Sequence, residues 1–246
     1  MHFNSNIRDI LKSMYRNTTA NLDWKGLKIK EIKSEKGLRQ GCTLSPLLFT
    51  LIMEELIWRV KKVGVGVKIN KEILCILTFA DDVILIAESM EDLQKMLDEV
   101  GKFSEDMKLK FETGKSKIMI VNKKQDNGEE RKGKLLGETL EFVDEFKYLG
   151  LTVNKTGLEK EKNTIRKKAE KMYGIINGKI NCRANKYEIM RGLWKGLAVP
   201  TVMYGMELID MGKKEEKGLE TIQNRAARRG LGANKYVATK ALRGEM

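Results

Sequence analysis

Residues 73–88 read ILCILTFADDVILIAE, an apolar run with two adjacent acids, Asp81 and Asp82, in its middle. The run predicts two buried strands that form a hairpin with the acids at its tip. Two like charges in such a place are costly unless a positive group meets them there. A divalent metal ion would do so, and the pair is therefore the strongest sign of a functional site in the sequence.

The chemistry of the stretch from Phe79 to Asp82 fits phosphoryl transfer. Two carboxylates at a hairpin tip can reach metal ions that bridge the end of a polymer and a nucleoside triphosphate. Two such ions, about 3.5–4 Å apart, stabilise the attacking and leaving oxygens of an in-line displacement. Mg²⁺ is a hard ion that prefers oxygen ligands, which carboxylates supply. The alternative is an ordinary turn, because aspartate is a common turn residue.

Three helices are predicted around this hairpin. An apolar stripe at helical spacing predicts the first over residues 7–15. Ser45 as an N-cap and Pro46 in the first turn predict a second helix. Ser89, followed three residues later by Asp92 in the manner of a capping box, predicts the third.

Further strands are predicted downstream. Residues 109–122 are expected to be extended, residues 123–134 to form a polar hairpin tip, and residues 138–153 to form a strand pair. Helices that alternate with hairpins favour an α+β fold, an antiparallel sheet with helices on one face. This pattern predicts a first domain over residues 1–154.

Residues 155–246 are predicted to be entirely helical, with helices that include residues 186–198 and 213–231. The net charge of +13 is concentrated here, because this part has 21 basic and 10 acidic side chains while residues 1–154 have 26 and 24. On its first helix, apolar residues form one face, and basic residues lie on the others: Arg166, Lys167, Lys168 and Lys171. These residues predict a surface that lies against a polyanion such as nucleic acid. The alternative is a solvated surface that keeps a basic protein in solution.

Other classes of protein are disfavoured. The three cysteines form no Cys-x-x-Cys pair and His2 is the only histidine, which excludes a zinc finger or knuckle. No stretch reaches the roughly 20 apolar residues of a membrane span, and the N-terminus lacks the apolar core of a signal peptide. The sequence therefore predicts an intracellular protein, in the nucleus or the cytoplasm, with no membrane partner.

A second stretch, GLRQGCTLSPLLF at residues 37–49, predicts a glycine-permissive loop that leads into a helix. Gly41 allows the backbone to come close to a ligand, and Arg39 and Gln40 offer hydrogen-bond donors to phosphates or base edges. The alternative is the ordinary start of a helix.

Four stretches in order, GLRQGCTLSPLLF, LTFADD (77–82), LKFETGKSK (109–117) and EFKYLGLTV (145–153), resemble the palm motifs of reverse transcriptases of non-LTR (LINE-type) retrotransposons. Residues 198–205 and 228–232 resemble the helical region that follows the palm in such enzymes. The resemblance implies a partial polymerase palm followed by a thumb or connection region. It also implies an RNA-directed DNA polymerase with Mg²⁺ as cofactor and an RNA template, a DNA primer and deoxynucleoside triphosphates as partners.

The resemblance also implies roles for individual residues. Asp81 and Asp82 match the family's catalytic, metal-binding acids, and Lys115 matches a lysine near the phosphates of the nucleotide, a candidate proton donor to the leaving pyrophosphate. For Lys115 the alternative is an ordinary surface lysine, and for Phe146 and Tyr148 it is core packing. The residues that match the nucleotide and template loop are Arg39, Gln40, Gly41, Phe79 and Ala80. Those that match the hairpin holding the primer end are Phe146, Lys147, Tyr148, Leu149 and Gly150.

One feature departs from the family pattern. The resemblance implies a third acid on a strand that precedes the Arg39–Gly41 loop, and neither Asp9 nor Asp23 lies in an apolar strand context. A two-metal site with only two of its acids is expected to lose most of its metal affinity. We therefore expect a polymerase domain truncated before its first catalytic acid and inactive by itself. The alternatives are a non-catalytic nucleic-acid-binding remnant and a degenerate reading frame without a stable product.

Overall fold

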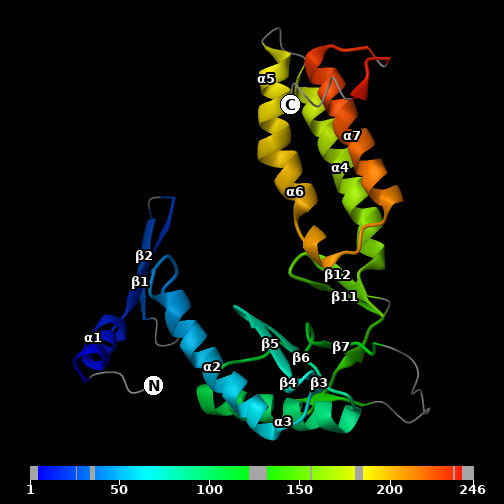
Figure 1. The fold of residues 1–246 in the computed structure, drawn as a ribbon. Coiled ribbons are helices and arrows are strands. Elements are labelled where there is room, and N and C mark those ends of the chain that lie inside the picture. The colour runs from blue at the N-terminus through cyan, green and yellow to red at the C-terminus, as the bar shows by residue number, and fades with distance from the viewer. Residues whose placement is uncertain are drawn as a thin grey trace. The chain divides into compact units, whose positions relative to one another are not determined.

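The computed structural model of the chain describes residues 5–25, 27–33, 37–121, 132–155, 157–180, 185–234 and 236–239. They divide into two compact units, Met1–Lys110 and Phe111–Met246. Both units combine helices with short strand pairs (Figure 1). The predicted α+β class, with a palm-like part followed by a helical part, is confirmed.

The first unit contains three helices and three antiparallel strand pairs among its described residues. The helices are α1 (Ser5–Tyr15), α2 (Ser45–Val63) and α3 (Met90–Met107). The strand pairs are β1 (Thr19–Trp24) with β2 (Leu27–Lys33), β3 (Val67–Ile69) with β4 (Glu72–Leu74), and β5 (Ile76–Phe79) with β6 (Asp82–Leu85). The three predicted helices are all present.

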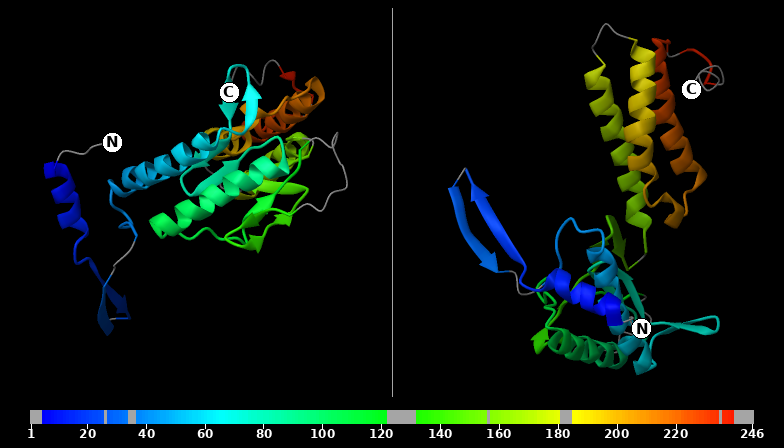
Figure 2. Two further views of the ribbon diagram at one scale, coloured as in Figure 1. Left: turned by 90° about the horizontal axis from the view of Figure 1, so that it is seen from below. Right: turned by 90° about the vertical axis from the view of Figure 1, so that its left-hand side faces the viewer.

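The core of this unit lies where α2 packs against α3, as Figure 2 shows. Leu56 and Val60 of α2 and Met96, Val100 and Phe103 of α3 are buried, at the spacing of three or four residues that gathers side chains on one helix face. At the edge of this core the two helices are also joined by an ion pair. The guanidinium of Arg59 on α2 lies 2.6 Å from the carboxylate of Asp106 on α3.

Of the two predicted N-caps, one is right and one is wrong. The backbone N–H of Asp92 donates to the hydroxyl of Ser89 at 3.1 Å, so Ser89 caps α3. Ser45 is instead the first helical residue of α2, and its hydroxyl donates to the carbonyl of Arg39 at 2.8 Å. The hydroxyl fixes the preceding loop and leaves Leu44 as a cap without a side-chain hydrogen bond.

The second unit begins with short strands. They are β7 (Lys117–Ile118), β8 (Lys134–Leu135), β9 (Glu138–Thr139), β10 (Glu141–Phe142), β11 (Glu145–Tyr148) and β12 (Leu151–Asn154). β8 pairs with β9 and β11 with β12, both antiparallel, while β7 pairs with β10 in parallel.

These strands differ in detail from the expected sheet. All the described strands pair two by two, so the strand pairs do not join into one continuous sheet. Most of the predicted extended segment over residues 109–122 is not a strand, since Lys115 and Ser116 donate backbone hydrogen bonds back to Glu112 and close a turn before β7. Of the predicted polar tip over residues 123–134, residues 123–131 lie outside the described part of the chain.

A bundle of helices follows. It consists of α4 (Glu159–Lys179), α5 (Lys186–Leu193), a π-helical turn (Trp194–Ala198), α6 (Val199–Met203), a short 3₁₀ turn η3 (Met206–Leu208) and α7 (Lys213–Leu231). Ile176 of α4, Met190 of α5 and Ile222 of α7 meet in its core. The helix predicted over residues 213–231 is confirmed, and that over residues 186–198 contains the π-helical turn.

The π-helical turn has a local cause. Pro200 has no backbone N–H and cannot continue the α-helical hydrogen bonding of its neighbours. The N–H of Val199 bonds the carbonyl of Trp194, five residues earlier, which widens the helix at this point.

Candidate active site

The acidic pair lies at the tip of the β5–β6 hairpin, as predicted. The register pairs Phe79 with Asp82, so the turn consists of Ala80 and Asp81. Asp81 therefore stands in the turn, and Asp82 is the first residue of β6. Ala80 has a φ of 52°, in the left-handed region that is uncommon for a residue with a Cβ. The strained turn holds two neighbouring carboxylates at one end of a short ribbon.

The expectation that this charge pair is buried is wrong. Asp81 and Asp82 are both exposed, and so are Leu77 and Phe79 on the strand that leads to them. Only the far end of the hairpin, at Cys75 and Ile76, is buried. Both carboxylates are accessible to solvent, so folding does not incur the free-energy cost of burying two like charges.

The fit of a divalent metal ion at this tip rests on its oxygen donors and their exposure. Two adjacent carboxylates supply hard oxygen ligands that suit Mg²⁺. The described residues contain no group of three or more His, Cys, Asp or Glu side chains placed to hold a metal ion. The hairpin tip therefore presents two exposed carboxylates, those of Asp81 and Asp82, which are oxygen donors of the kind that Mg²⁺ prefers.

The Arg39–Gly41 loop is tied to the end of α1. The guanidinium of Arg39 donates to the carbonyl of Met14 at 2.7 Å and to the hydroxyl of Thr18 at 3.2 Å. It also lies over the ring of Tyr15, 5.8 Å from its centre. Both of these hydrogen bonds come from Nη2, one of the nitrogens of a guanidinium group that carries five N–H donors. Gln40 and Gly41 are exposed.

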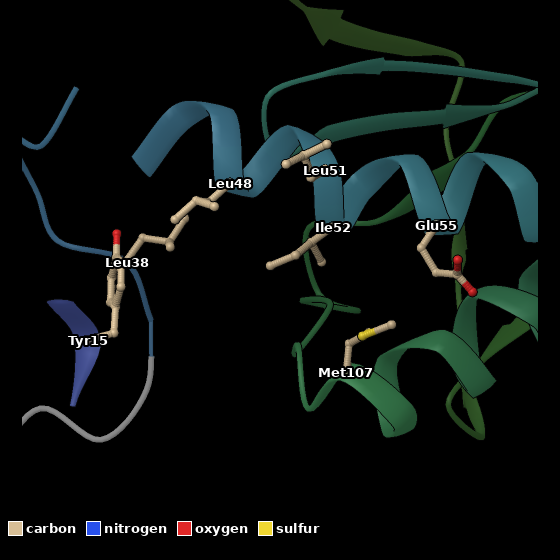
Figure 3. A pocket seen from close by; sticks show the side chains of 7 residues that line it. All are labelled: Tyr15, Leu38, Leu48, Leu51, Ile52, Glu55 and Met107. Atoms are coloured by element: carbon tan, nitrogen blue, oxygen red, sulfur yellow. The ribbon is translucent and has the colours of Figure 1, made fainter. Parts of the chain in front are cut away.

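A pocket beside this loop was not indicated by the sequence. It has a volume of about 420 Å³, and Leu48, Ile52 and Glu55 of α2 line it together with Tyr15 and Met107. Figure 3 shows Tyr15 at one end and the Glu55 carboxylate at the other. The spacing of the α2 residues, four and then three positions apart, marks a helix face that the α2–α3 core leaves uncovered.

Lys115 lies in the second unit, in the turn before β7. Its ammonium group pairs with the carboxylate of Glu112 at 2.6 Å, and its side chain is 80% exposed. The hydrogen bond that the Lys115 ammonium donates to Glu112, and secondly the negative charge of Glu112, raise the pKa of Lys115 above its ordinary value. The pair keeps Lys115 protonated to a higher pH than an isolated lysine, and it makes the ammonium group a weaker proton donor than a general acid whose pKa lies near neutral pH.

The Glu112→Gln variant should lower the pKa of Lys115 towards its ordinary value, because glutamine offers no negative charge. The measurement is a pH titration of the Lys115 ammonium signal by NMR. Glu138→Gln is the matched control, since Glu138 bonds the neighbouring Thr113 hydroxyl and not Lys115. A pKa of Lys115 that stays the same in Glu112→Gln would contradict the pairing.

The β11–β12 hairpin brings the proposed primer-holding residues together. Phe146 pairs with Val153, Lys147 with Thr152, and Tyr148 with Leu151. Leu149 and Gly150 form the turn, with φ values of 46° and 81°. Phe146 is exposed and therefore does not pack in a core, while Tyr148 is half-buried.

The basic residues of α4 divide into two groups. Arg166, Lys167 and Lys171 are exposed, and the first two border a polar hollow of about 490 Å³ with Asn163 and Glu170. Lys168 is half-buried, with its ammonium nitrogen 4.0 Å from the Glu161 carboxylate. The exposed basic face of α4 is thus formed by three of the four predicted residues, and Lys168 turns inward.

Comparison with known proteins agrees with the four sequence motifs. The profile of the family "Reverse transcriptase (RNA-dependent DNA polymerase)" matches residues 1–153. The Pol polyprotein of the type-2 retrotransposable element R2DM of Drosophila melanogaster is 30% identical over 156 residues, which is 61% of this chain and 15% of that protein. The Pol polyprotein of the type-1 retrotransposable element R2 of Nasonia vitripennis is 30% identical over 162 residues, with the same two shares.

The chain spans about 15% of the length of these curated relatives. Reverse transcriptases in general bind nucleic acid templates and nucleotides and use divalent metal ions. Among the described residues, no helix combines the length and the apolar character needed to cross a membrane.

The family profile covers more than half of the 246 residues, and the chain belongs to the reverse transcriptase family as a domain of the non-LTR retrotransposon type.

Proposed function

We propose that residues 1–246 take part in RNA-directed DNA synthesis as the acid-bearing palm and the helical region of a non-LTR retrotransposon polymerase. The observation that carries the proposal is the β5–β6 hairpin, which presents Asp81 and Asp82 side by side at an exposed tip. A bound Mg²⁺ ion would polarise the phosphate oxygens and stabilise the charge that develops during nucleotide addition. Asp81 and Asp82 would hold it.

The other residues of the first unit have supporting roles in this proposal. Phe79 and Ala80 set the position of the acids and lie beside the nucleotide. Gln40 and Gly41 face solvent from the loop before α2 and would contact the incoming nucleotide or the template. Arg39 would contribute its remaining donors while it holds the loop against α1.

The residues of the second unit would hold the nucleic acid. Lys115 would meet the nucleotide phosphates as a protonated amine. The β11–β12 hairpin, residues Phe146, Lys147, Tyr148, Leu149 and Gly150, would hold the primer end. The exposed basic face of α4 would follow the phosphate backbone, since lysine and arginine neutralise phosphates and release counterions. We further propose that residues 1–154 form the palm and residues 155–246 the thumb or connection region.

A second candidate is a nucleic-acid-binding remnant without catalysis. It is favoured by the excess of 21 basic over 10 acidic side chains in residues 155–246, which suffices for binding without any metal. The two candidates differ in whether the complex recognises the next nucleotide.

The test measures how tightly the polypeptide 1–246 binds an RNA template annealed to a DNA primer that lacks a 3′ hydroxyl. The deoxynucleoside triphosphate complementary to the next template base should strengthen binding in the presence of Mg²⁺, and a mismatched one should not. Asp81→Asn should remove the difference. Equal binding with matched and mismatched nucleotides would support the remnant and contradict the polymerase role.

Primer extension by the same polypeptide is expected to be absent or very slow. Residues 1–246 supply two of the three acids that such polymerases use, and each missing carboxylate weakens the stabilisation of the transition state. The measurement is extension of a labelled primer with an ordinary 3′ hydroxyl. Robust extension that Asp81→Asn abolishes would contradict this expectation and show that two acids suffice.

A further inference from the structure

The segment between α6 and η3 reverses the direction of the chain beside a strand pair. It contains Tyr204 and Gly205, which follow the end of α6 at Met203. Gly205 has a φ of 77°, which turns the chain back along the helices. Figure 1 shows this turn next to the β11–β12 hairpin, within the same unit.

Tyr204 holds the turn of that hairpin. Its hydroxyl donates to the carbonyl of Leu149 at 2.6 Å. Its ring lies against Gly150, where an added Cβ would stand 3.4 Å from the ring carbon Cε1. Both residues of the β11–β12 turn therefore touch one aromatic side chain from a segment 55 residues away.

Gly205 packs against Leu151, the residue that follows the β11–β12 turn. A Cβ on Gly205 would lie 2.7 Å and 2.8 Å from the two methyl carbons of Leu151, so only a glycine allows this approach. Leu151 is 7% exposed, and its methyl carbons pack closely against Gly205. The first residue of β12 is fixed by packing, while the turn before it is fixed by the tyrosine.

Glu161 of α4 fixes the position of Thr152, the residue that follows Leu151 in β12. Its Oε1 atom accepts a hydrogen bond from the backbone N–H of Thr152 at 2.9 Å. Glu161 is 2% exposed, and a buried carboxylate that accepts a backbone N–H has little freedom to move. Four consecutive residues, 149 to 152, are thus fixed by three residues, two from the turn between α6 and η3 and one from α4.

We propose that Tyr204, Gly205 and Glu161 are positioning residues that hold the β11–β12 turn in one place relative to the helices, so that the hairpin presents the 3′-terminal nucleotide of the primer in a single position. The inference rests on the proposed role of this hairpin in holding the primer. The three residues touch the hairpin and act on the primer only through it.

The experiment is photo-crosslinking of polypeptide 1–246 to a primer whose terminal base is 4-thiothymine, annealed to an RNA template. The wild-type protein should crosslink through residues 146–150. Tyr204→Phe removes only the hydroxyl and should reduce this crosslink about five-fold, as the loss of one hydrogen bond allows, with the affinity for the primer–template unchanged within about two-fold. Gly205→Ala, which displaces Leu151, should give the same loss.

Tyr173→Phe is the matched control, because it removes a hydroxyl from the same unit and leaves the ring under Arg225. It should crosslink like the wild type. A wild-type crosslink that Tyr204→Phe leaves unchanged would overturn the positioning role and leave the proposed function standing. A terminal base that crosslinks nowhere on the hairpin, in a complex that does bind, would overturn the primer-holding role and this inference with it.

Discussion

Replacement of both Asp81 and Asp82 by asparagine is expected to lower the affinity of polypeptide 1–246 for Mn²⁺ at least about tenfold, or about 1.4 kcal/mol. Asparagine keeps the size of the side chain and one carbonyl oxygen but removes the negative charges that attract a divalent ion. Mn²⁺ stands in for Mg²⁺ because both take oxygen ligands and Mn²⁺ is visible by electron paramagnetic resonance. Titration of free Mn²⁺ by this method gives the affinity.

The matched control changes another adjacent pair of acids in the same unit, Asp98 and Glu99 of α3, to Asn and Gln. Asp98 bonds Gln94, and Glu99 pairs with Lys102, so both carboxylates already have partners. The control removes the same charge and should leave Mn²⁺ affinity within about two-fold. An equal loss in both variants would mean that Mn²⁺ responds to net charge alone and that the hairpin tip is no site.

Charge reversal on the exposed basic face of α4 is expected to weaken nucleic-acid binding. Arg166→Glu combined with Lys167→Glu should lower the affinity for a primer–template at least about tenfold at physiological salt, because two attractions to phosphates become repulsions. The slope of log affinity against log salt should fall by about 0.7–0.9 for each phosphate that the protein no longer neutralises. Filter binding over a range of salt concentrations measures both quantities.

Lys123→Glu with Lys124→Glu is the control for this pair, since it makes the same change in net charge elsewhere in the chain. This control should lower the affinity for the primer–template clearly less than the double variant on α4 does. Lys168 is left out of the reversed set because it is half-buried and its ammonium nitrogen lies 4.0 Å from the Glu161 carboxylate. Equal losses in the two double variants would contradict a distinct binding face on α4.

Features that depend on neighbouring residues could be predicted from the sequence. Ser89 caps α3 as its spacing to Asp92 indicated, and the last long helix covers Lys213–Leu231 as expected. The turn at Asp81 also follows from local pattern, because two apolar strands meet at the acids. In each case the bonds that decide the structure join residues a few positions apart.

Features that depend on distant partners could not be predicted in this way. Ser45 looks like an N-cap, but its hydroxyl bonds Arg39 because the loop before α2 folds back onto the helix start. The exposure of Asp81 depends on what packs against the hairpin, and an apolar sequence does not say which of its faces is covered. Tyr204 meets Leu149 across 55 residues, an interaction without any signal in the local sequence.

The most direct test of a metal site at the β5–β6 tip is the paramagnetic effect of Mn²⁺ on the backbone amide signals of polypeptide 1–246. Sub-stoichiometric Mn²⁺ should broaden the signals of Phe79, Ala80, Asp81, Asp82 and Val83 first, and the broadening should vanish in the double asparagine variant. Broadening that is spread evenly over the acidic residues of the chain, or that persists at the tip after both acids are replaced, would contradict the assignment of Asp81 and Asp82 as metal ligands.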